Sequence, residues 1–338
     1  MDRNDRLREI LDAMSGATVA VMGDLVADLY LYGQTKRVSR EAPVLILEHQ
    51  SERLVLGGAA NAIHNAHTLG ARVVPIGIVG RDPAGAAVRD ELRVLNVNDE
   101  WVLDVDGRAT TTKQRIVGSG QNTTFQQILR IDRGDTRPVD RVTEMRLVEA
   151  VTEASRDCGV LVVSDYGYGV FTPAVIERVN HLAESGRVRV LIDSRYRLTQ
   201  FRGAYAMTPN EPEAQEAGGR VIRTDNDAEE VGRALMSATG AQSIVVTRGR
   251  RGMCLVRPDE PARHIPIFGG DEIADVTGAG DTVIATIAAA TAAGADLLEA
   301  CVLANVAGGL VVMKAGTATV SAAEIREATL REDPWPSS

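Results

Sequence analysis

Short apolar runs alternate along the chain with segments of helical period. The runs are bounded by polar or glycine residues and predict buried parallel strands at residues 18–22, 72–79, 160–163, 188–192 and 243–246. The segments between them carry apolar residues three and four positions apart, which predicts helices at residues 59–69, 83–95, 141–155, 173–183 and 228–239. This alternation favours an α/β fold in which helices cover a mainly parallel central sheet.

Two stretches interrupt the alternation, at residues 29–50 and 101–133. Polar and β-branched residues alternate in the second, as in residues 110–117, which predicts antiparallel strands with one solvated face. Inserted into a parallel α/β domain, such strands would form a small lid over the carboxyl ends of the main strands, where open sheets place their ligands. The pattern alone leaves a simple surface hairpin equally open.

The last part of the chain, from residue 275, is predicted to be helical. Helices are expected at residues 278–293 and 296–313, followed by a loop at 314–319 and a closing helix from Ser321. The length of 338 residues fits one large α/β domain or two ordinary ones. Because no linker, repeat or low-complexity segment divides the chain, residues 1–338 are interpreted as a single domain with a lid.

Charge and composition exclude several classes of function. A net charge of −9 opposes general nucleic-acid binding, which needs a basic face. Cys158, Cys254 and Cys301 lie far apart in apolar stretches without a C-x-x-C pair, which favours buried thiols in a reducing compartment and hence a cytoplasmic protein. Neither a secretory signal nor an apolar span long enough for a membrane helix is predicted.

The most informative segment is the glycine-rich turn Asp275-Val-Thr-Gly-Ala-Gly-Asp281, which leads into a long apolar helix. The N–H groups of Gly278, Ala279 and Gly280 would stand free at the helix start, where the dipole favours an anion such as a phosphoryl group in transfer. Asp281 would stay ionised in the first turn and accept the proton of an attacking hydroxyl. Taken alone, the pattern more often marks an ordinary turn before a helix.

A second polar element, Thr208-Pro-Asn-Glu-Pro-Glu213, follows an apparent strand at residues 204–207. Asn210 and Glu213 share a helix face and could orient water and Mg²⁺ on nucleotide phosphates, because Mg²⁺ usually keeps several waters and few protein ligands. The same pair is equally typical of a capping box, which needs no metal.

A third element, Gly57-Gly58-Ala-Ala-Asn61, opens a predicted helix. Its two glycines let a ligand approach the backbone, and Asn61 could then bond a sugar hydroxyl. Upstream, Asp28 follows the first strand and could accept two hydroxyl protons near the same edge. Loops and helix caps remain the alternative reading of both.

The order of these elements resembles the ribokinase (PfkB) family of carbohydrate kinases across nearly the whole chain. Within that family the sequence is most similar to the D-glycero-β-D-manno-heptose 7-phosphate 1-kinases. The matching segments are Tyr32-Gly, Ser39-Arg-Glu-Ala-Pro43, Leu56-Gly-Gly-Ala-Ala-Asn61, Thr112-Lys-Gln-Arg115, Ser164-Asp-Tyr166, Leu191-Ile-Asp193, Asn210-x-x-Glu213 and Asp275-Val-Thr-Gly-Ala-Gly-Asp281.

The resemblance implies a ribokinase-like three-layer α/β/α fold with a small β lid, ATP and Mg²⁺ as cofactors, and K⁺ as a candidate monovalent cation. The implied catalytic residues are Asp281 as base and Gly278, Ala279 and Gly280 as anion hole. The implied sugar contacts are Asp28, Gly57, Gly58 and Asn61. The implied nucleotide and metal residues are Asn210, Glu213, Asp193, Arg195, Thr247, Gly249 and Asn305, with Glu213 reaching Mg²⁺ through water and Asp275, Thr277 and Gly316 around the monovalent cation.

The phosphate already present on the acceptor is assigned to cations on the lid, Lys113 and Arg115, with Arg37 as a further candidate. Without the family context, such residues on an exposed strand are usually solvated. Tyr168 departs from the heptose kinases, which typically carry lysine at this position. If that lysine holds phosphate in the family, the acceptor of this chain differs.

The sequence thus predicts an ATP-dependent kinase that phosphorylates heptose 7-phosphate at its anomeric hydroxyl. The alternatives are another sugar or nucleoside kinase of the same fold and a non-catalytic, sugar-binding regulatory relative. Bifunctional relatives add a nucleotidyltransferase with an H-x-G-H signature, which is not found here, so adenylylation is expected to need a separate protein. A homodimer joined through the lid strands is predicted, because exposed strand edges invite pairing.

Overall fold

Two β-sheets organise the chain in the computed structural model, which describes residues 3–120, 125–270, 275–314 and 316–336. Residues 121–124 of the predicted lid, residue 315 of the predicted loop and both ends of the predicted domain lie outside these ranges. Within them, the larger sheet has nine strands in the order β13-β12-β11-β10-β9-β8-β1-β4-β5 and the smaller has four in the order β3-β2-β6-β7.

The larger sheet is parallel from β5 to β11 and ends in two antiparallel strands, β12 and β13. Its strands are β1 (Thr18–Gly23), β4 (Arg72–Gly80), β5 (Val102–Val105), β8 (Val160–Asp165), β9 (Arg189–Ser194), β10 (Ala206–Met207), β11 (Ile244–Thr247), β12 (Met253–Val256) and β13 (Arg263–Ile265). The five predicted strands are confirmed within two or three residues. The antiparallel pair at the edge was not predicted.

Alternation along the central strands divides the core into two apolar clusters, one on each face of the sheet. In β1, Val19 and Val21 belong to one cluster, whereas Ala20 and Met22 belong to the other. All four are fully buried, because both faces of the sheet are covered. This explains why the central strands are continuously apolar in sequence rather than alternately polar.

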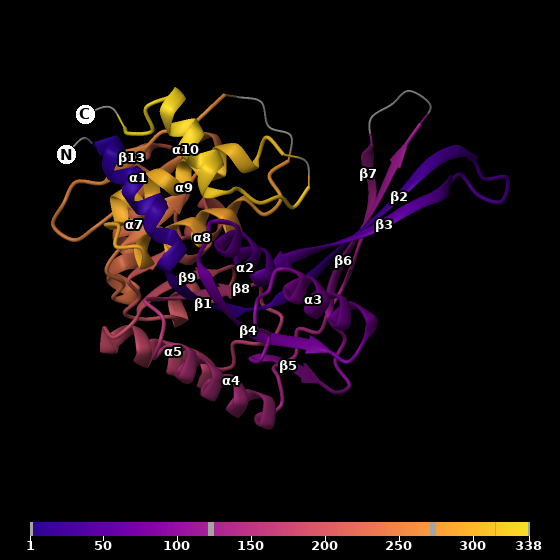
Figure 1. Cartoon of the computed structure of the whole chain (residues 1–338), viewed down its shortest axis with the longest axis horizontal. Helices are drawn as coiled ribbons and strands as arrows, with labels where there is room; N and C mark the ends of the chain where they lie inside the picture. The colour runs from indigo at the N-terminus through magenta and orange to yellow at the C-terminus, as the bar shows by residue number, and fades with distance from the viewer. Residues whose placement is uncertain (1–2, 121–124, 271–274, 315, 337–338) are drawn as a thin grey trace.

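Helices cover both faces and complete three layers (Figure 1). One cluster includes apolar residues of the helices α1 (Arg3–Ala13), α2 (Ala59–Thr68), α3 (Pro83–Val94), α8 (Ala279–Ala292), α9 (Leu297–Val311) and α10 (Ala322–Arg331). The other includes those of α4 (Arg141–Ala154), α5 (Pro173–Ser185), α6 (Glu211–Gly218) and α7 (Asp225–Thr239). The predicted three-layer α/β/α fold and its helices are confirmed.

The smaller sheet projects from the body as an arm (Figure 1). Its strands are β2 (Leu25–Val38), β3 (Leu45–Gly58), β6 (Thr111–Ser119) and β7 (Gln126–Arg133). The predicted lid boundaries need correction, because β5 pairs with β4 in the larger sheet and the lid therefore begins at Thr111 rather than residue 101. The prediction of antiparallel strands is wrong for one pair, since β2 and β6, which are far apart in sequence, run parallel.

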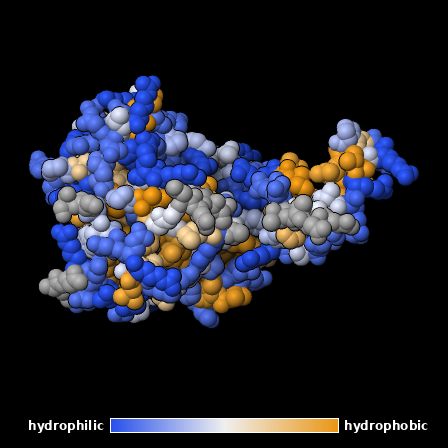
Figure 2. Space-filling view, turned by 90° about the horizontal axis from the view of Figure 1, so that it is seen from above, coloured by the Kyte–Doolittle hydropathy of each residue, from blue (hydrophilic) through white to orange (hydrophobic). Residues whose placement is uncertain are grey.

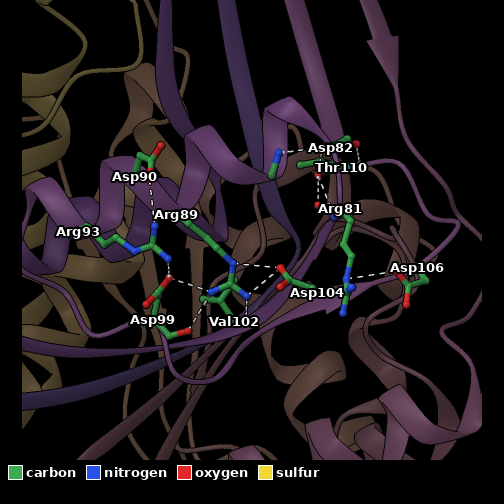
Figure 3. A network of polar contacts seen from close by, with 12 residues as sticks. Arg81, Asp82, Arg89, Asp90, Arg93, Asp99, Val102, Asp104, Asp106 and Thr110 are labelled. Atoms are coloured by element: carbon green, nitrogen blue, oxygen red, sulfur yellow. Dashed lines mark hydrogen bonds and ion pairs between the residues drawn. The ribbon is translucent and has the colours of Figure 1, made fainter.

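The chain passes between the two sheets at a junction centred on Asp82 (Figure 3). Asp82 caps α3 by accepting the N–H of Gly85 at 2.8 Å, and it also accepts the N–H and hydroxyl of Thr110 at 2.8 and 2.7 Å. Thr110 in turn accepts the N–H of Gly80 at 2.8 Å. Burial opposes ionisation of Asp82, but these donors outweigh it and lower the pKa of its carboxyl. The starts of α3 and of the lid strand β6 thus share one carboxylate, and Thr110 links the end of β4 to them.

A second cluster in the same view fixes β5 against α3 (Figure 3). The guanidinium of Arg89 on α3 bonds the carboxylates of Asp99 and Asp104 at 2.8 and 2.9 Å and the carbonyl of Val102. Because Arg89 is largely buried, these charge-assisted bonds satisfy a cation that would otherwise lack solvent.

Two further sequence-based expectations concern the cysteines and the membrane. The three cysteines are free and buried. Among the described helices, none combines the length and the apolarity required to cross a bilayer.

Replacing Asp82 by alanine is expected to lower the free energy of unfolding by about 2 kcal/mol, because α3 loses its cap and two donors of Thr110 lose their acceptor. Urea unfolding measures this loss. Asp90→Ala on the same helix is the matched control, since Asp90 pairs with Arg93 at the exposed surface; its effect is expected within about 0.5 kcal/mol. Equal losses in the two variants would contradict a special role for the junction.

Candidate active site

A polar cavity of about 490 Å³ lies where the carboxyl ends of the parallel strands meet the base of the lid. Strand order reverses at β1, which has β8 on one side and β4 on the other, and open sheets bind ligands at such a point. The cavity is lined by the strand ends, the lid and the start of α8. The lining residues include Asp28, Lys113, Arg115, Tyr166, Asp193, Arg195, Asn210, Glu213, Thr247, Gly278, Gly280 and Asp281. Most residues predicted from separate motifs are therefore brought together.

Two helices point their starts at this cavity without a side-chain cap. α2 begins after Gly58 and α8 after Gly278, whereas α3 to α7, α9 and α10 each have a capping Asp, Asn, Ser or Thr. Gly278 has φ of 81°, and a Cβ there would lie 2.5 Å from Nδ2 of Asn61, so only glycine fits. No side chain caps the N–H groups of either first turn, although the N–H of Ala59 donates to the carbonyl of Asp24 at 3.0 Å. Of the predicted anion hole, Gly278 and Gly280 line it, whereas the N–H of Ala279 is directed at the Val276 carbonyl at 3.3 Å.

Asp281 lies in the first turn of α8 and is buried, with 4% of its surface exposed. Its Oδ2 accepts Nδ2 of Asn61 at 2.9 Å, and its Oδ1 accepts the hydroxyl of Tyr166 at 2.8 Å. Asn61 is itself held by Asn65, whose Nδ2 donates to Oδ1 of Asn61 at 3.0 Å. The predicted base thus has a fixed orientation at the floor of the cavity.

Burial changes the expected acidity of Asp281. Desolvation raises the pKa of its carboxyl from 3.8 to about 6, although Asn61, Tyr166 and Lys113 favour the ionised form. The pKa rises because the loss of water outweighs the local donors. The carboxylate is still ionised at neutral pH, and its basicity is higher than that of a surface aspartate.

Asp28 and Arg115 form a buried ion pair at the base of the lid. Nη1 of Arg115 lies 2.7 Å from Oδ1 of Asp28, and the hydroxyl of Thr317 donates to Oδ2 at 3.2 Å. Gly57 packs behind the carboxylate, where a Cβ would come within 2.6 Å of Oδ2. Asp28 and Gly58 line the cavity, whereas Gly57 supports Asp28 from behind. The charge of Arg115 is largely used by Asp28, so this cation is less available for a ligand than expected.

Lys113 and Arg195 are the cations that converge near Asp281. Both lie against the ring of Tyr166, with Nζ of Lys113 at 5.0 Å and Cζ of Arg195 at 5.3 Å from its centroid. Arg130 on β7 also lines the cavity, although Asp132 binds it at 2.9 Å. Arg37 is exposed on the outer part of β2 and does not line the cavity.

Asn210 and Glu213 form the capping box that was the alternative interpretation. Oδ1 of Asn210 accepts the N–H of Glu213, and Oε2 of Glu213 accepts the N–H of Asn210, both at 2.9 Å. Both residues nevertheless line the cavity, with Oε1 of Glu213 at 3.9 Å from Nε of Arg195. The pair can therefore cap α6 and still present side-chain oxygen to a ligand.

Negative charge accumulates beside this pair. Burial raises the pKa of Glu213, and burial together with the carboxylates of Glu213 and Asp281 raises the pKa of Asp193 well above its ordinary value. Such mutual repulsion favours a bound cation. Within the described ranges, no three His, Cys, Asp or Glu side chains converge closely enough to hold a metal by themselves, so any cation here would need water or ligand oxygens as well.

A second, mostly apolar cavity of about 340 Å³ adjoins the first and shares Thr247, Val276 and Gly280 with it. Gly249 and Asn305, both predicted nucleotide residues, line it. The amide of Asn305 donates to the Pro266 carbonyl at 2.7 Å, which fixes one wall. An apolar cavity next to a polar one suits a nucleotide, whose planar base would enter the apolar cavity and whose phosphates would enter the polar one.

The three residues predicted around a monovalent cation are also brought together. The carboxylate of Asp275 accepts the N–H of Thr277 at 2.9 Å and the N–H of Gly316 at 3.2 Å. This joins the glycine-rich turn to the loop before α10.

Tyr166 is the main site residue that motif reasoning missed. It stood inside the matched segment Ser164-Asp-Tyr166 but was given no role there, because sequence alone does not show that its side chain reaches Asp281. The sequence did show that Tyr166 directly follows an apolar strand. Residues at the carboxyl ends of parallel strands commonly contact the ligand.

The family is settled by a match over almost the whole chain. A model of the pfkB family carbohydrate kinases matches residues 17–324. The chain belongs to this family. As a pfkB carbohydrate kinase it is a phosphotransferase with an alcohol group as acceptor.

Curated relatives refine the family match. The kinase is 42% identical over 325 residues to "Bifunctional protein HldE" of Caulobacter vibrioides, covering 95% of this chain and 65% of the relative. It is 38% identical to the protein of the same name in Paramagnetospirillum magneticum, covering 97% of this chain and 66% of the relative. The chain thus spans about 65% of the length of these relatives.

Solved structures agree in fold. The kinase has a TM-score of 0.67 and 19% identity with Arabidopsis thaliana ribokinase complexed with ribose and ATP, covering 93% of this chain and 97% of that one. With phosphofructokinase-2 from Escherichia coli in complex with potassium, the TM-score is 0.73 and the identity 18%, covering 93% and 98%. These likenesses confirm the ribokinase-like fold.

The raised pKa of Asp281 predicts the pH dependence of the kinase. If Asp281 is the catalytic base, it works only when deprotonated, so kcat/KM is expected to be level above about pH 6 and to fall as pH drops through that value, roughly tenfold for each further pH unit. Initial rates at limiting acceptor measure the profile. Acceptor binding over the same range is the control, since a sugar phosphate itself titrates near pH ~6. A profile level down to pH ~4, the ordinary range of a carboxyl, would contradict the assignment.

Proposed function

We propose that this kinase transfers the γ-phosphoryl group of ATP to the anomeric hydroxyl of a heptose 7-phosphate. The observation that supports the proposal best is the placement of Asp281 between an uncapped helix start and the cations Lys113 and Arg195. The choice of acceptor rests on the motifs shared with heptose kinases and on the similarity to proteins named HldE. Use of ATP also favours the cytoplasm as the site of the reaction.

The chain's own residues suit this transfer. The N–H groups at the start of α8 would bind the equatorial oxygens of the phosphoryl group, where charge accumulates in the transition state. Asp281 would receive the acceptor's proton, and its orientation by Asn61 and Tyr166 keeps one lone pair available toward the cavity. The apolar cavity at Asn305 would hold the adenine.

Magnesium fits the carboxylates beside the nucleotide. Burial raises the pKa of both Asp193 and Glu213, and the carboxylates of Glu213 and Asp281 raise that of Asp193 further, so a divalent cation would stabilise the ionised forms. Glu213 would reach the ion through water, since one of its oxygens already caps α6. Bound there, Mg²⁺ would neutralise phosphate charge.

A monovalent cation fits the turn formed by Asp275, Thr277 and Gly316, next to the start of α8. The carboxylate of Asp275 accepts two backbone N–H groups there and keeps lone pairs for a cation. Potassium is the candidate by analogy with the neighbouring phosphofructokinase-2 structure.

The acceptor's own phosphate is assigned to Lys113, with Arg195 and Arg130 close by in the same cavity. Burial lowers the pKa of Lys113, and a dianionic phosphate paired with this lysine would favour its charged form. Arg115 keeps a supporting role through Asp28. Tyr168 lines the same cavity, and its phenol in place of lysine favours a second candidate, a different phosphorylated sugar.

The acceptor is tested by measuring ADP release with Mg-ATP over a panel of free and phosphorylated sugars. Heptose 7-phosphate is expected to give the highest kcat/KM, and free heptose a value lower by a factor on the order of 10² because the phosphate contacts are lost. Turnover of another sugar phosphate, with none of heptose 7-phosphate, would replace the first candidate by the second.

The base is tested in the same assay with Asp281→Asn, which keeps the shape of the side chain but cannot accept the proton. Its kcat is expected to fall by about 10²- to 10⁴-fold while ATP binding, measured by calorimetry, persists. Undiminished turnover would exclude Asp281 as base. Sugar binding without any turnover in the unmodified chain would instead identify the non-catalytic regulatory relative.

We also propose that two copies associate through the lid. Every residue of β7 is exposed, and apolar side chains gather on the arm (Figure 2). The exposed apolar residues of the smaller sheet and its loops are Val38, Val44, Leu45, Phe125, Ile128, Leu129 and Ile131. An exposed apolar surface with free strand edges favours pairing with a second sheet of the same kind.

Light scattering at assay concentration is expected to give twice the chain mass of 36.1 kDa. Leu129→Glu, on the exposed strand β7, is expected to convert the dimer to a monomer, because a charge would be buried in the apolar contact. Met145→Glu on α4, equally exposed but on the body, should remain dimeric. A monomeric unmodified chain would refute the association.

A further inference from the structure

Tyr166 reaches Asp281 from a different part of the fold. It follows β8, and its N–H donates to Oδ2 of Asp24 at 2.8 Å, which fixes the backbone at the end of that strand. From there the side chain crosses the floor of the cavity, and its hydroxyl donates to Oδ1 of Asp281 at 2.8 Å. Strand β8 and helix α8 are therefore joined at the reacting group itself.

The ring of Tyr166 is held between two cations from other elements. Lys113 on the lid strand β6 and Arg195 after β9 both lie within cation–π distance, at 5.0 and 5.3 Å from the ring centroid. These contacts hold the ring in place, so the hydroxyl has little freedom to leave Asp281. The phenol is itself unsuited to act as a base, because burial and the nearby Asp281 raise its pKa well above the ordinary value. It therefore remains a donor.

We propose that Tyr166 is a positioning residue of phosphoryl transfer, which holds the carboxylate of Asp281 in the orientation that receives the acceptor's proton. The inference rests on the proposed kinase function. Asn61 fixes one oxygen and Tyr166 the other, so removal of the phenol leaves the carboxylate attached at a single oxygen and free to turn.

The same bond also favours the ionised form of Asp281. The charged and titratable groups that face Asp281 are Lys113 from the lid, Asp28 from β2, Asp193 from β9 and the phenol of Tyr166. Lys113 favours ionisation and the two carboxylates oppose it. Because burial already penalises the charge, loss of one donor is expected to shift the titration upward.

Tyr166→Phe removes the hydroxyl and keeps the ring between its two cations. The acid limb of the kcat/KM profile is expected to move up by on the order of one pH unit. At pH ~6 the rate should therefore fall by roughly fivefold, and at pH ~8 by less than about threefold, while the KM for ATP stays unchanged. Tyr205→Phe is the matched control, since Tyr205 lies away from the cavity against Arg189, and its profile should match that of the unmodified chain.

A second variant tests the opposite direction without removing the side chain. Incorporation of 3-fluorotyrosine at position 166 makes the phenol a stronger donor at nearly constant shape, and the acid limb should move to lower pH. An infrared titration of the Asp281 carboxyl, assigned by its absence in Asp281→Asn, follows the same shifts without any substrate. This readout separates failure of the inference from failure of the proposed function.

Opposite shifts in the phenylalanine and fluorotyrosine proteins, seen in the infrared titration and in the rate profile, would support the inference. An acid limb and a carboxyl titration that stay in place in both variants would overturn it. A uniform loss of rate at every pH with no shift would also overturn it, because that is the result of a merely structural side chain. If Tyr166→Phe does not fold, the fluorotyrosine protein decides alone.

Discussion

The burial of an ionisable carboxylate at the start of α8 is the constraint on which the site depends. α8 is apolar around its whole circumference and is buried in the core, so its first turn cannot move toward water. Asp281 therefore lacks solvent and relies on Asn61, Tyr166 and the N–H groups of an uncapped helix start. The partial compensation leaves a carboxylate that is ionised at neutral pH but more basic than a solvated aspartate, and each group that compensates it comes from a different element.

The fold places these groups because the sheet brings many loop starts to one edge. β8, β9, β10 and β11 run parallel and end at the same edge of the sheet, so each contributes a polar residue at or just after its end. Helices α3 to α7, α9 and α10 use an Asp, Asn, Ser or Thr as a cap for their own first turn. α2 and α8 begin after glycine instead, so no side chain caps their first turn. The capped helices stabilise the scaffold, and the proposed anion site lies at the uncapped starts.

The sequence was sufficient for the layers and for most cavity residues, because apolar runs and glycine-rich turns are local signals. It was insufficient wherever a long-range pairing decided the outcome. The parallel pairing of β2 with β6 and the place of β5 beside β4 depend on contacts between distant segments, and no periodicity encodes them. For the same reason the pairing of Arg115 with Asp28 was not predicted, and Tyr166 was passed over although it touches Asp281.

The lid and the base are coupled through these same long-range contacts. Lys113 belongs to the lid strand β6, yet it lies on the ring of Tyr166, which holds Asp281. Strand β6 begins immediately after Thr110, whose N–H and hydroxyl donate to the carboxylate of Asp82 on the body. Several hydrogen bonds hold the junction at Asp82, whereas a single cation–π contact joins Lys113 to Tyr166. A displacement of the lid would therefore move Lys113 away from Tyr166 before it disturbed the large sheet. An acceptor phosphate that binds Lys113 would thus stabilise the arrangement that orients the base, which links recognition of the substrate's existing phosphate to the transfer of the next one.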